Sequence, residues 1–327
     1  MYHEVCEYQF PVTYEEFLWS YEDNVFGQNL KGIVYDVYNY LRNILEGTVV
    51  KHNAIIAGPS ASGKTEFYRT TKKLLEDYQC PIPVIHIDMT AFSPAGFQGA
   101  ELSAIPEAIL NANSYGPAIV FLDEFDKVLS PLCGSSGGDL NQTIQSELLT
   151  MVEGRQIPVR QRGVVKEVDT SQTLFIALGA LTDSRSEKSM GFEAQLVTEK
   201  STFSAYDLQS LGGSVELLGR FDNVYNFNSI TEEDFERLFS HLIETMEKEE
   251  KIFIRYDKDT FRDFFPYVRS QFGVREVKRM IYATIQPILI DLADETNRIK
   301  YHITIHGVNN ADVSTKPVQH KISHKSV

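Results

Sequence analysis

The stretch NAIIAGPSASGKT, Asn53 to Thr65, decides the fold of this chain. A short apolar run predicts a buried strand, a turn rich in glycine and serine follows it, and Lys64 to Tyr78 has the pattern of a helix. The turn matches G-x-x-x-x-G-K-[ST] and lies between a strand and a helix, the context that this pattern needs. A chance match is the alternative, and the flanking strand and helix argue against it.

Such a turn is suited to bind a nucleoside triphosphate. Because glycine has no side chain, backbone N–H groups can approach phosphate oxygens, and the amino end of the helix adds its dipole. We expect Lys64 to contact the β and γ phosphates and the hydroxyl of Thr65 to bind Mg²⁺. The expected phosphate-binding residues are Gly58, Pro59, Ser60, Ala61, Ser62, Gly63, Lys64 and Thr65.

An acidic pair, Asp123 and Glu124, closes the apolar run AIVFLDE. Ligands of open α/β sheets bind at the carboxyl ends of strands. We expect Asp123 to support Mg²⁺ and its water shell, and Glu124 to orient and deprotonate a hydrolytic water. A pair that merely caps a strand is the alternative, which the nearby phosphate-binding loop disfavours. ATP and Mg²⁺ are therefore the predicted cofactors.

Strand and helix patterns alternate through the first two thirds of the chain. This alternation predicts a parallel sheet with helices on both faces. The expected strands are 53–58, 83–88, 118–124 and 173–179, and the expected helices are 28–45, 64–78, 102–113 and 140–152. From about residue 230 the pattern becomes mainly helical, with one short strand at 300–307. The predicted domains are an N-terminal extension (1–22), a large α/β domain (23–229), a small mainly α-helical domain (230–306) and a disordered tail (307–327).

Composition narrows the class of protein. The 327 residues are 43% hydrophobic and 23% charged, as in ordinary globular proteins, and no apolar run approaches the ~20 residues of a membrane span. The first ten residues lack a basic region typical of a signal peptide, so we expect a cytoplasmic protein. The net charge of −14 disfavours direct binding to nucleic acid or to anionic membranes. Three scattered cysteines fit neither a disulfide framework nor a zinc site.

With both motifs in place, the chain resembles the AAA+ ATPases, and within them the ClpX/HslU-type protein unfoldases, over roughly residues 23–305. NVFGQ resembles the adenine-pocket segment of that family, which implies that Val25 and Phe26 flank the base. ELLGRFDNV resembles the arginine-finger box, which implies that Arg220 reaches the γ-phosphate of a neighbouring subunit. GVREVKRMI resembles the sensor-2 helix, which implies that Arg275 contacts the nucleotide in cis.

The stretch SPAGFQGAEL, Ser93 to Leu102, places Phe97 and Gln98 between two glycines. By itself it is typical of a turn whose phenylalanine folds back onto the domain. The resemblance implies instead the first pore loop of the family, in which Phe97 grips an extended polypeptide in the central channel.

Other segments depart from the family pattern. Met190, Gly191 and Phe192 resemble the I/L/V-G-F/L tripeptide that docks on the ClpP peptidase, although methionine is a departure and an ordinary surface loop is the alternative. The basic stretch RQIPVRQRGVVK is either a solvated loop or a loop at the channel mouth, and it lacks the Arg-Lys-His string of the family. We expect no N-terminal four-cysteine zinc-binding domain of the kind that the family carries, and we expect the sensor-1 position to be vacant or filled by Thr182 or Asp183.

The sequence thus predicts an ATP-driven unfoldase that threads polypeptide substrates through a hexameric pore, with a ClpP-type peptidase as a candidate partner. A homo-hexamer is expected because an arginine finger acting in trans requires a neighbouring subunit. The alternatives are a non-proteolytic remodeller or nucleotide-gated switch for a specific partner complex, and an inactive ATP-binding scaffold. The last is disfavoured because all five expected catalytic and sensing residues are present: Lys64, Asp123, Glu124, Arg220 and Arg275.

Overall fold

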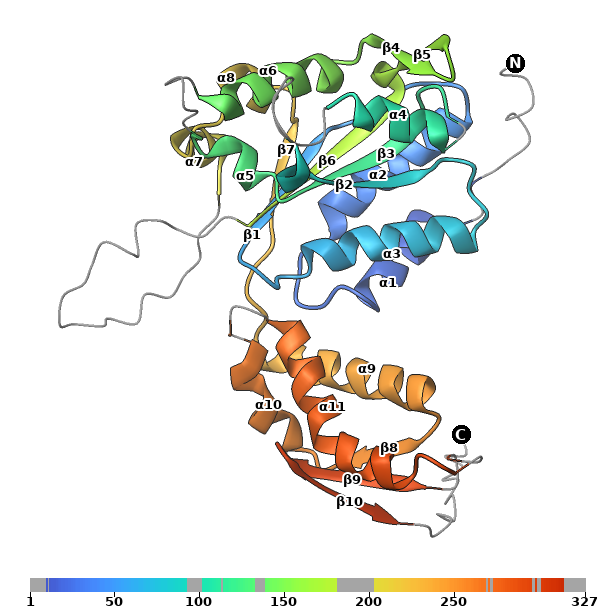
Figure 1. Ribbon diagram of the computed structural model, residues 1–327, viewed down its shortest axis with the longest axis vertical. Coiled ribbons are helices and arrows are strands. Elements are labelled where there is room, and N and C mark those ends of the chain that lie inside the picture. The colour runs from blue at the N-terminus through green and yellow to red at the C-terminus, as the bar shows by residue number, and fades with distance from the viewer. Residues whose placement is uncertain are drawn as a thin grey trace, which may run out of the picture. The chain divides into compact units, whose positions relative to one another are not determined.

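The computed structural model of the chain describes residues 10, 12–92, 102–112, 114–132, 139–180, 203–268, 270, 273–295, 298 and 301–314. Residue contacts divide the chain into two compact units, Met1–Asn228 and Ser229–Val327. Each unit has its own sheet and its own helices (Figure 1). None of the described helices combines the length and apolar character that crossing a membrane requires.

A five-stranded parallel sheet lies at the centre of the first unit, with the strand order β2-β3-β6-β1-β7. Its strands are β1 (Ala54–Gly58), β2 (Val84–Asp88), β3 (Ala118–Asp123), β6 (Thr173–Ala180) and β7 (Asn223–Asn226). The chain runs from β1 to β2 at one edge of the sheet, and later returns to place β7 on the other side of β1. The winding therefore reverses at β1, which is where open α/β sheets bind ligands.

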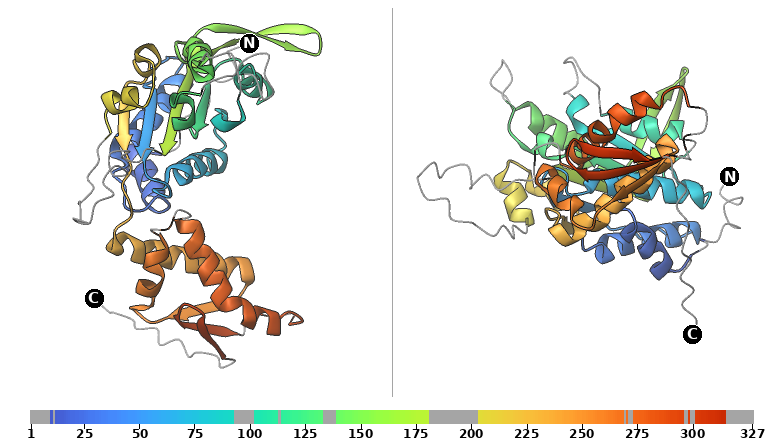
Figure 2. Two further views of the ribbon diagram at one scale, coloured as in Figure 1. Left: turned by 60° about the vertical axis from the view of Figure 1, so that its left-hand side comes forward. Right: turned by 90° about the horizontal axis from the view of Figure 1, so that it is seen from below.

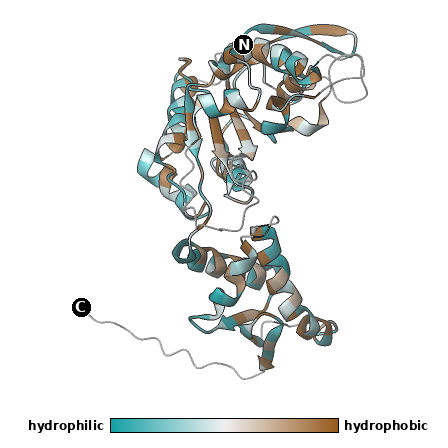
Figure 3. Ribbon diagram, turned by 90° about the vertical axis from the view of Figure 1, so that its left-hand side faces the viewer, coloured by the Kyte–Doolittle hydropathy of each residue, from teal (hydrophilic) through white to brown (hydrophobic). Residues whose placement is uncertain are grey.

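Helices cover both faces of this sheet (Figure 1). One face carries α1 (Tyr14–Glu22), α2 (Lys31–Leu45) and α3 (Lys64–Asp77). The opposite face carries α4 (Ala104–Asn111), α5 (Asp126–Leu129), α6 (Leu140–Val152), α7 (Ala205–Ser210) and α8 (Val215–Leu218). Strands β1, β3 and β6 are buried on both sides, which is why they are almost uninterrupted apolar runs (Figure 3). The predicted α/β fold is confirmed.

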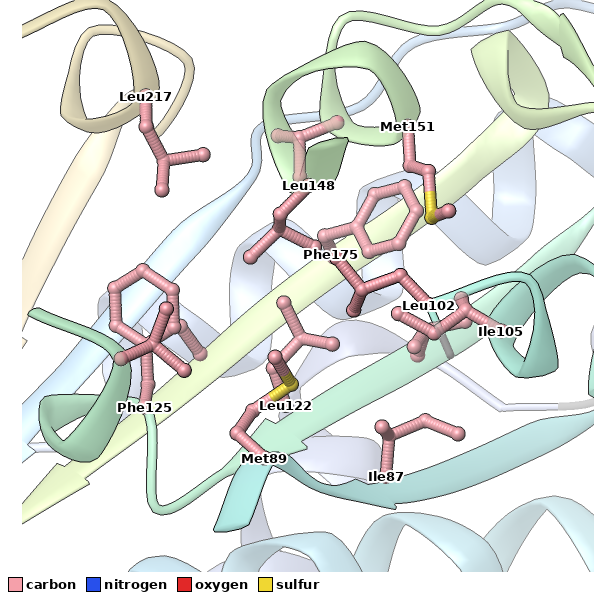
Figure 4. Packing of buried hydrophobic residues seen from close by; sticks show 14 of the residues in the cluster. Ile87, Met89, Leu102, Ile105, Leu122, Phe125, Leu148, Met151, Phe175 and Leu217 are labelled. Atoms are coloured by element: carbon pink, nitrogen blue, oxygen red, sulfur yellow. The ribbon is translucent and has the colours of Figure 1, made fainter. Parts of the chain in front are cut away.

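The apolar core fixes the carboxyl end of β3. Leu122 and Phe125 lie at this end, and Phe175 projects from β6 toward Leu148 and Met151 of α6 (Figure 4). All five side chains are at least nine-tenths buried. Close packing of this kind leaves the backbone between β3 and α5 little freedom to shift.

The basic stretch, for which the sequence predicted no regular structure, forms an antiparallel hairpin of β4 (Gln156–Gln161) and β5 (Val164–Asp169) (Figure 2). The φ angles of Arg162 and Gly163 are 50° and 79°, as a two-residue hairpin turn requires. Short 3-10 turns follow β2 (Met89–Ala91) and β5 (Thr170–Gln172).

In the part of the second unit that the structure describes, three α-helices pack with a three-stranded sheet of order β10-β9-β8. The helices are α9 (Glu232–Glu250), α10 (Thr260–Val268) and α11 (Val274–Asp291). The strands are β8 (Phe253–Tyr256), β9 (His302–Gly307) and β10 (Asn310–Ser314), of which only β9 was predicted.

Two predicted domain assignments are wrong in part. The expected disordered tail at 307–327 begins with ordered chain, because Asn310–Ser314 pairs with β9 through its backbone, a contact for which a polar stretch needs no apolar pattern. Residues 315–327 lie outside the described residues. The expected N-terminal extension at 1–22 contains α1, which buries Phe17, Leu18 and Tyr21 in the core of the first unit.

Candidate active site

The loop from Gly58 to Gly63 joins the buried strand β1 to helix α3. A Cβ on Gly58 would overlap the carbonyl oxygen of Phe227, so glycine is required where the loop leaves the strand. Gly63 precedes the helix with φ of 94°, a left-handed conformation that glycine adopts without strain. The first intrahelical bond runs from the N–H of Phe67 to the carbonyl of Gly63, so the N–H groups of the first turn have no partner within the helix. The loop is therefore a cradle of backbone donors.

Lys64 lies in this cradle and is only 8% exposed. Its ammonium donates to the carbonyl oxygens of Gly58 at 2.9 Å and Pro59 at 2.7 Å. Burial lowers the pKa of Lys64 to about 8, against the opposing effect of nearby carboxylates. A phosphate group next to the ammonium would offset this cost of burial, because an opposite charge favours the charged form.

Three carboxylates lie at the end of β3 and just after it: Asp123, Glu124 and Asp126. Asp123 Oδ1 accepts a hydrogen bond from the N–H of Glu124 at 2.9 Å, and its Oδ2 lies 2.9 Å from Nε2 of His86. Asp126 is buried, and its Oδ1 accepts from the N–H of Ala180 at 2.8 Å. Asp126 thus joins the ends of β3 and β6, and fixes the turn on which Asp123 and Glu124 lie.

Glu124 has the backbone and the electrostatic surroundings of a functional residue. Its φ is 55°, an uncommon conformation for a residue other than glycine and one that clusters at functional sites. Burial raises the pKa of its carboxyl above the ordinary value, and the charges of Asp126 and Asp123 raise this pKa further. A raised pKa brings a carboxylate closer to the basicity that a general base needs.

The predicted adenine-pocket residues lie beside the phosphate-binding loop. Val25 is buried, and its Cγ1 would be 3.4 Å from a Cβ placed on Gly63. Phe26, next in the chain, is partly buried. The side-chain amide of Gln28 donates to the carbonyl of Asn228 and accepts from its N–H, at 2.8 and 2.7 Å. These two hydrogen bonds connect the segment around Val25 and Phe26 to Asn228, the last residue of the first unit.

Arg220 follows α8, and its guanidinium donates to Oε1 of Glu153 at 2.7 Å. Arg155 donates to the second oxygen of the same carboxylate at 2.8 Å. The hydrogen bond from Arg220 lowers the pKa of the Glu153 carboxyl most, and the bond from Arg155 lowers it further. The backbone of Arg220 is held by Asn53, whose side chain donates to its carbonyl at 3.1 Å, while the Arg220 side chain is half exposed. Arg220 thus has a fixed backbone and an accessible side chain, and its role as a finger stays a prediction.

The other predicted site residues divide between the second unit and undescribed segments. Arg275 is exposed in the first turn of α11. The predicted pore-loop residues Phe97 and Gln98, the docking residues Met190, Gly191 and Phe192, and the sensor-1 candidates Thr182 and Asp183 lie outside the described residues.

Sequence reasoning missed His86, Asp126 and Glu153. Each acts through a contact with a different strand or loop, and such contacts leave no spacing pattern in the chain. The acidic turn DEFD offered the only signal, since Asp126 is the next acid after Glu124 in that run.

The residues present fit a magnesium–nucleotide complex. The loop offers backbone donors and one buried ammonium for phosphate oxygens. Asp123 and the hydroxyl of Thr65 are the oxygen ligands that Mg²⁺ prefers. A carboxylate suited to proton abstraction follows Asp123 directly. The sheet, the loop and the acidic strand end together define a P-loop nucleotide-binding protein.

Comparisons with known proteins agree with this class. The protein-family model for the AAA domain (Cdc48 subfamily) matches residues 50–224, just over half of the chain. The ATP-dependent Clp protease ATP-binding subunit ClpX of Porphyromonas gingivalis is 28% identical over 246 residues, covering 64% of this chain and 58% of that protein. The ClpX of Treponema denticola is 30% identical over 265 residues, covering 70% of this chain and 62% of that protein. The ClpX of Bacteroides thetaiotaomicron is 25% identical over 339 residues, covering 90% of this chain and 80% of that protein.

The chain belongs to the AAA domain family and is a ClpX-like AAA+ ATPase. It spans about three fifths of the length of the first two of these relatives, 58% and 62%. Nucleotide binding follows from this membership.

Replacing Gly58 with alanine should destabilise the first unit. The added Cβ would overlap the backbone of Phe227, which a side-chain rotation cannot relieve, and overpacking of this kind costs about 1–3 kcal/mol. Urea denaturation followed by circular dichroism measures the loss. Ser60→Ala, at an exposed position of the same loop, is the control and should unfold at the wild-type urea concentration. An unchanged midpoint for Gly58→Ala would contradict the close approach of Phe227.

Proposed function

We propose that this protein is an ATP-driven protein unfoldase, which works in the cytoplasm as a homo-hexamer and threads polypeptide through its central pore. The observation that carries the proposal is that one site combines a buried P-loop lysine with the nearby carboxylates at the end of β3. The relatives of this chain are named as the ATP-binding subunit of an ATP-dependent Clp protease. The net charge of −14 supports polypeptide rather than nucleic acid as the substrate.

In this proposal each residue of the site has one task. The loop N–H groups and Lys64 bind the β and γ phosphates. Thr65 and Asp123 hold Mg²⁺, which supplies positive charge next to the phosphates when it is bound. Glu124 takes a proton from the attacking water. Arg220 stabilises the charge that develops on the γ-phosphate of the neighbouring subunit, and Arg275 senses the nucleotide from the second unit of the same chain.

Coupling to polypeptide rests on the proposed pore loop. Phe97 and Gln98 follow β2 in the sequence, and the neighbouring strand β3 carries the acids of the site. We propose that the aromatic ring of Phe97 grips extended chain of any sequence. We also propose that Met190, Gly191 and Phe192 dock on a ClpP-type peptidase.

Replacing Phe97 with alanine should abolish unfolding while ATP turnover stays within about twofold of wild type, because the change removes the grip and leaves the nucleotide site intact. The measurement follows ATP turnover and loss of fluorescence of a tagged fluorescent protein, with and without a ClpP peptidase. Tyr115→Ala, which removes an exposed aromatic side chain elsewhere in the same unit, is the matched control.

Unfolding by the Phe97→Ala variant at the wild-type rate would reject the pore loop. If the wild-type protein turns over ATP and leaves the fluorescent substrate folded, the function is that of a remodeller or switch for a specific partner. Fluorescence loss that is unaffected by the peptidase would reject the docking proposal alone.

A further inference from the structure

His86 lies on the edge strand β2, beside the acidic end of β3. In the parallel register His86 pairs with Phe121, and Asp123 lies two residues after Phe121 on the same face of the sheet. Phe121 belongs to the apolar cluster that includes Phe67 of α3, so His86 and Asp123 both face the helix that follows the phosphate-binding loop. The strand pairing therefore aims this imidazole at the carboxylate proposed to bind Mg²⁺.

An aromatic contact fixes the imidazole ring. Tyr68 lies four residues after Lys64, one helical turn further along α3, and its ring centroid is 4.6 Å from that of His86. The Tyr68 ring also meets Phe121 edge-on, at 5.3 Å. The imidazole thus lies between helix and strand, and the His86 side chain is 30% exposed.

The hydrogen bond between His86 and Asp123 has a defined direction. An ionised carboxylate can only accept, so Nε2 of His86 carries the hydrogen and donates it to Oδ2 over 2.9 Å. The other oxygen, Oδ1, accepts from the N–H of Glu124. Each oxygen is therefore held by one donor from the chain and keeps lone pairs for a metal ion or its water. Two donors on two oxygens fix the plane of the carboxylate.

We propose that His86 is a positioning residue, which orients the carboxylate of Asp123 for Mg²⁺. The inference rests on the proposed function of this site in binding Mg²⁺ and ATP. In this proposal His86 acts only through Asp123. Partners of this kind, one step removed from the metal, change metal affinity by about 10–100-fold when they are replaced.

The test measures the Mg²⁺ dependence of binding of a fluorescent ATP analogue to His86→Leu and His86→Gln. Leucine fills the space without a donor, and should raise the half-saturating Mg²⁺ concentration about tenfold while binding in EDTA stays at the wild-type level. Glutamine places an amide donor near the position of Nε2, and should return the Mg²⁺ requirement to within about threefold of wild type. His52→Leu, which removes a partly exposed histidine next to Asp222, is the matched control and should leave this requirement unchanged.

The outcomes separate this inference from the proposed function. Three outcomes would each overturn the positioning role and leave the proposed function standing. The His86→Leu variant keeps the wild-type Mg²⁺ requirement, or it binds the analogue as weakly in EDTA as it does with Mg²⁺ relative to wild type. In the third outcome, His86→Gln needs as much Mg²⁺ as His86→Leu. A wild-type protein that binds the analogue without any effect of Mg²⁺ would overturn both.

Discussion

Replacing Glu124 with glutamine should abolish ATP turnover while the protein still binds ATP. Glutamine has nearly the same size and can accept hydrogen bonds, but its amide cannot take a proton from water. A positioned general base contributes about 10²–10⁴-fold to the rate, so turnover should fall by at least about 100-fold. Release of phosphate measures turnover, and titration with a fluorescent ATP analogue measures binding.

Glu107→Gln is the matched control for this prediction, because it makes the same chemical change at an exposed position of α4 in the same unit. It should turn over ATP at the wild-type rate. Turnover by Glu124→Gln within a fewfold of wild type would exclude Glu124 as the base. Loss of ATP binding by the same variant would show instead that the turn held by Asp126 needs the carboxylate for its structure.

The phosphate-binding loop and the acidic pair could be predicted because their chemistry is local. The glycines and Lys64 follow one strand directly, and Asp123 and Glu124 end another. The parallel sheet then brings the carboxyl ends of both strands to one edge without any further information from the sequence. The left-handed backbone of Glu124 was not predictable, because no glycine or asparagine marks the position.

The contacts around these acids depend on which strands are neighbours. His86 meets Asp123 because β2 pairs with β3, and Asp126 meets Ala180 because β3 pairs with β6. Nothing in the spacing of these residues along the chain encodes strand order. The pairing of Arg220 with Glu153 could not be predicted for the same reason, because the two residues are far apart in the sequence.

The missed elements had weaker but readable signals. Thr13 and Glu16 form a capping box at the start of α1, a pattern visible in the sequence as T-x-x-E. The hairpin β4–β5 turns at Arg162-Gly163, where the charge of the segment suggested a solvated loop. β10 is short, polar and exposed, so hydrophobic alternation could not reveal it.

Replacing Arg220 with alanine should reduce ATP turnover by about 10³-fold or more while each subunit still binds ATP, because an arginine finger contributes about that much to phosphoryl transfer. The geometry allows the guanidinium to leave its present partner. The ion pair between Arg220 and Glu153 is exposed, and exposed pairs of this kind are typically worth about 0–1 kcal/mol. Arg155→Ala is the matched control, since Arg155 binds the same carboxylate and should be dispensable for turnover.

Mixing two inactive variants tests whether Arg220 acts on a neighbouring subunit. In a ring that contains both Glu124→Gln and Arg220→Ala subunits, some sites have an intact Glu124 and face an intact Arg220 from the next subunit. With random mixing in equal amounts, about a quarter of the sites meet this condition, because a head-to-tail ring places one neighbour at each site. Turnover should therefore recover to about that fraction of the wild-type rate. If the mixture stays as inactive as its two components, Arg220 acts within its own subunit, and the argument for a ring built around a finger in trans fails.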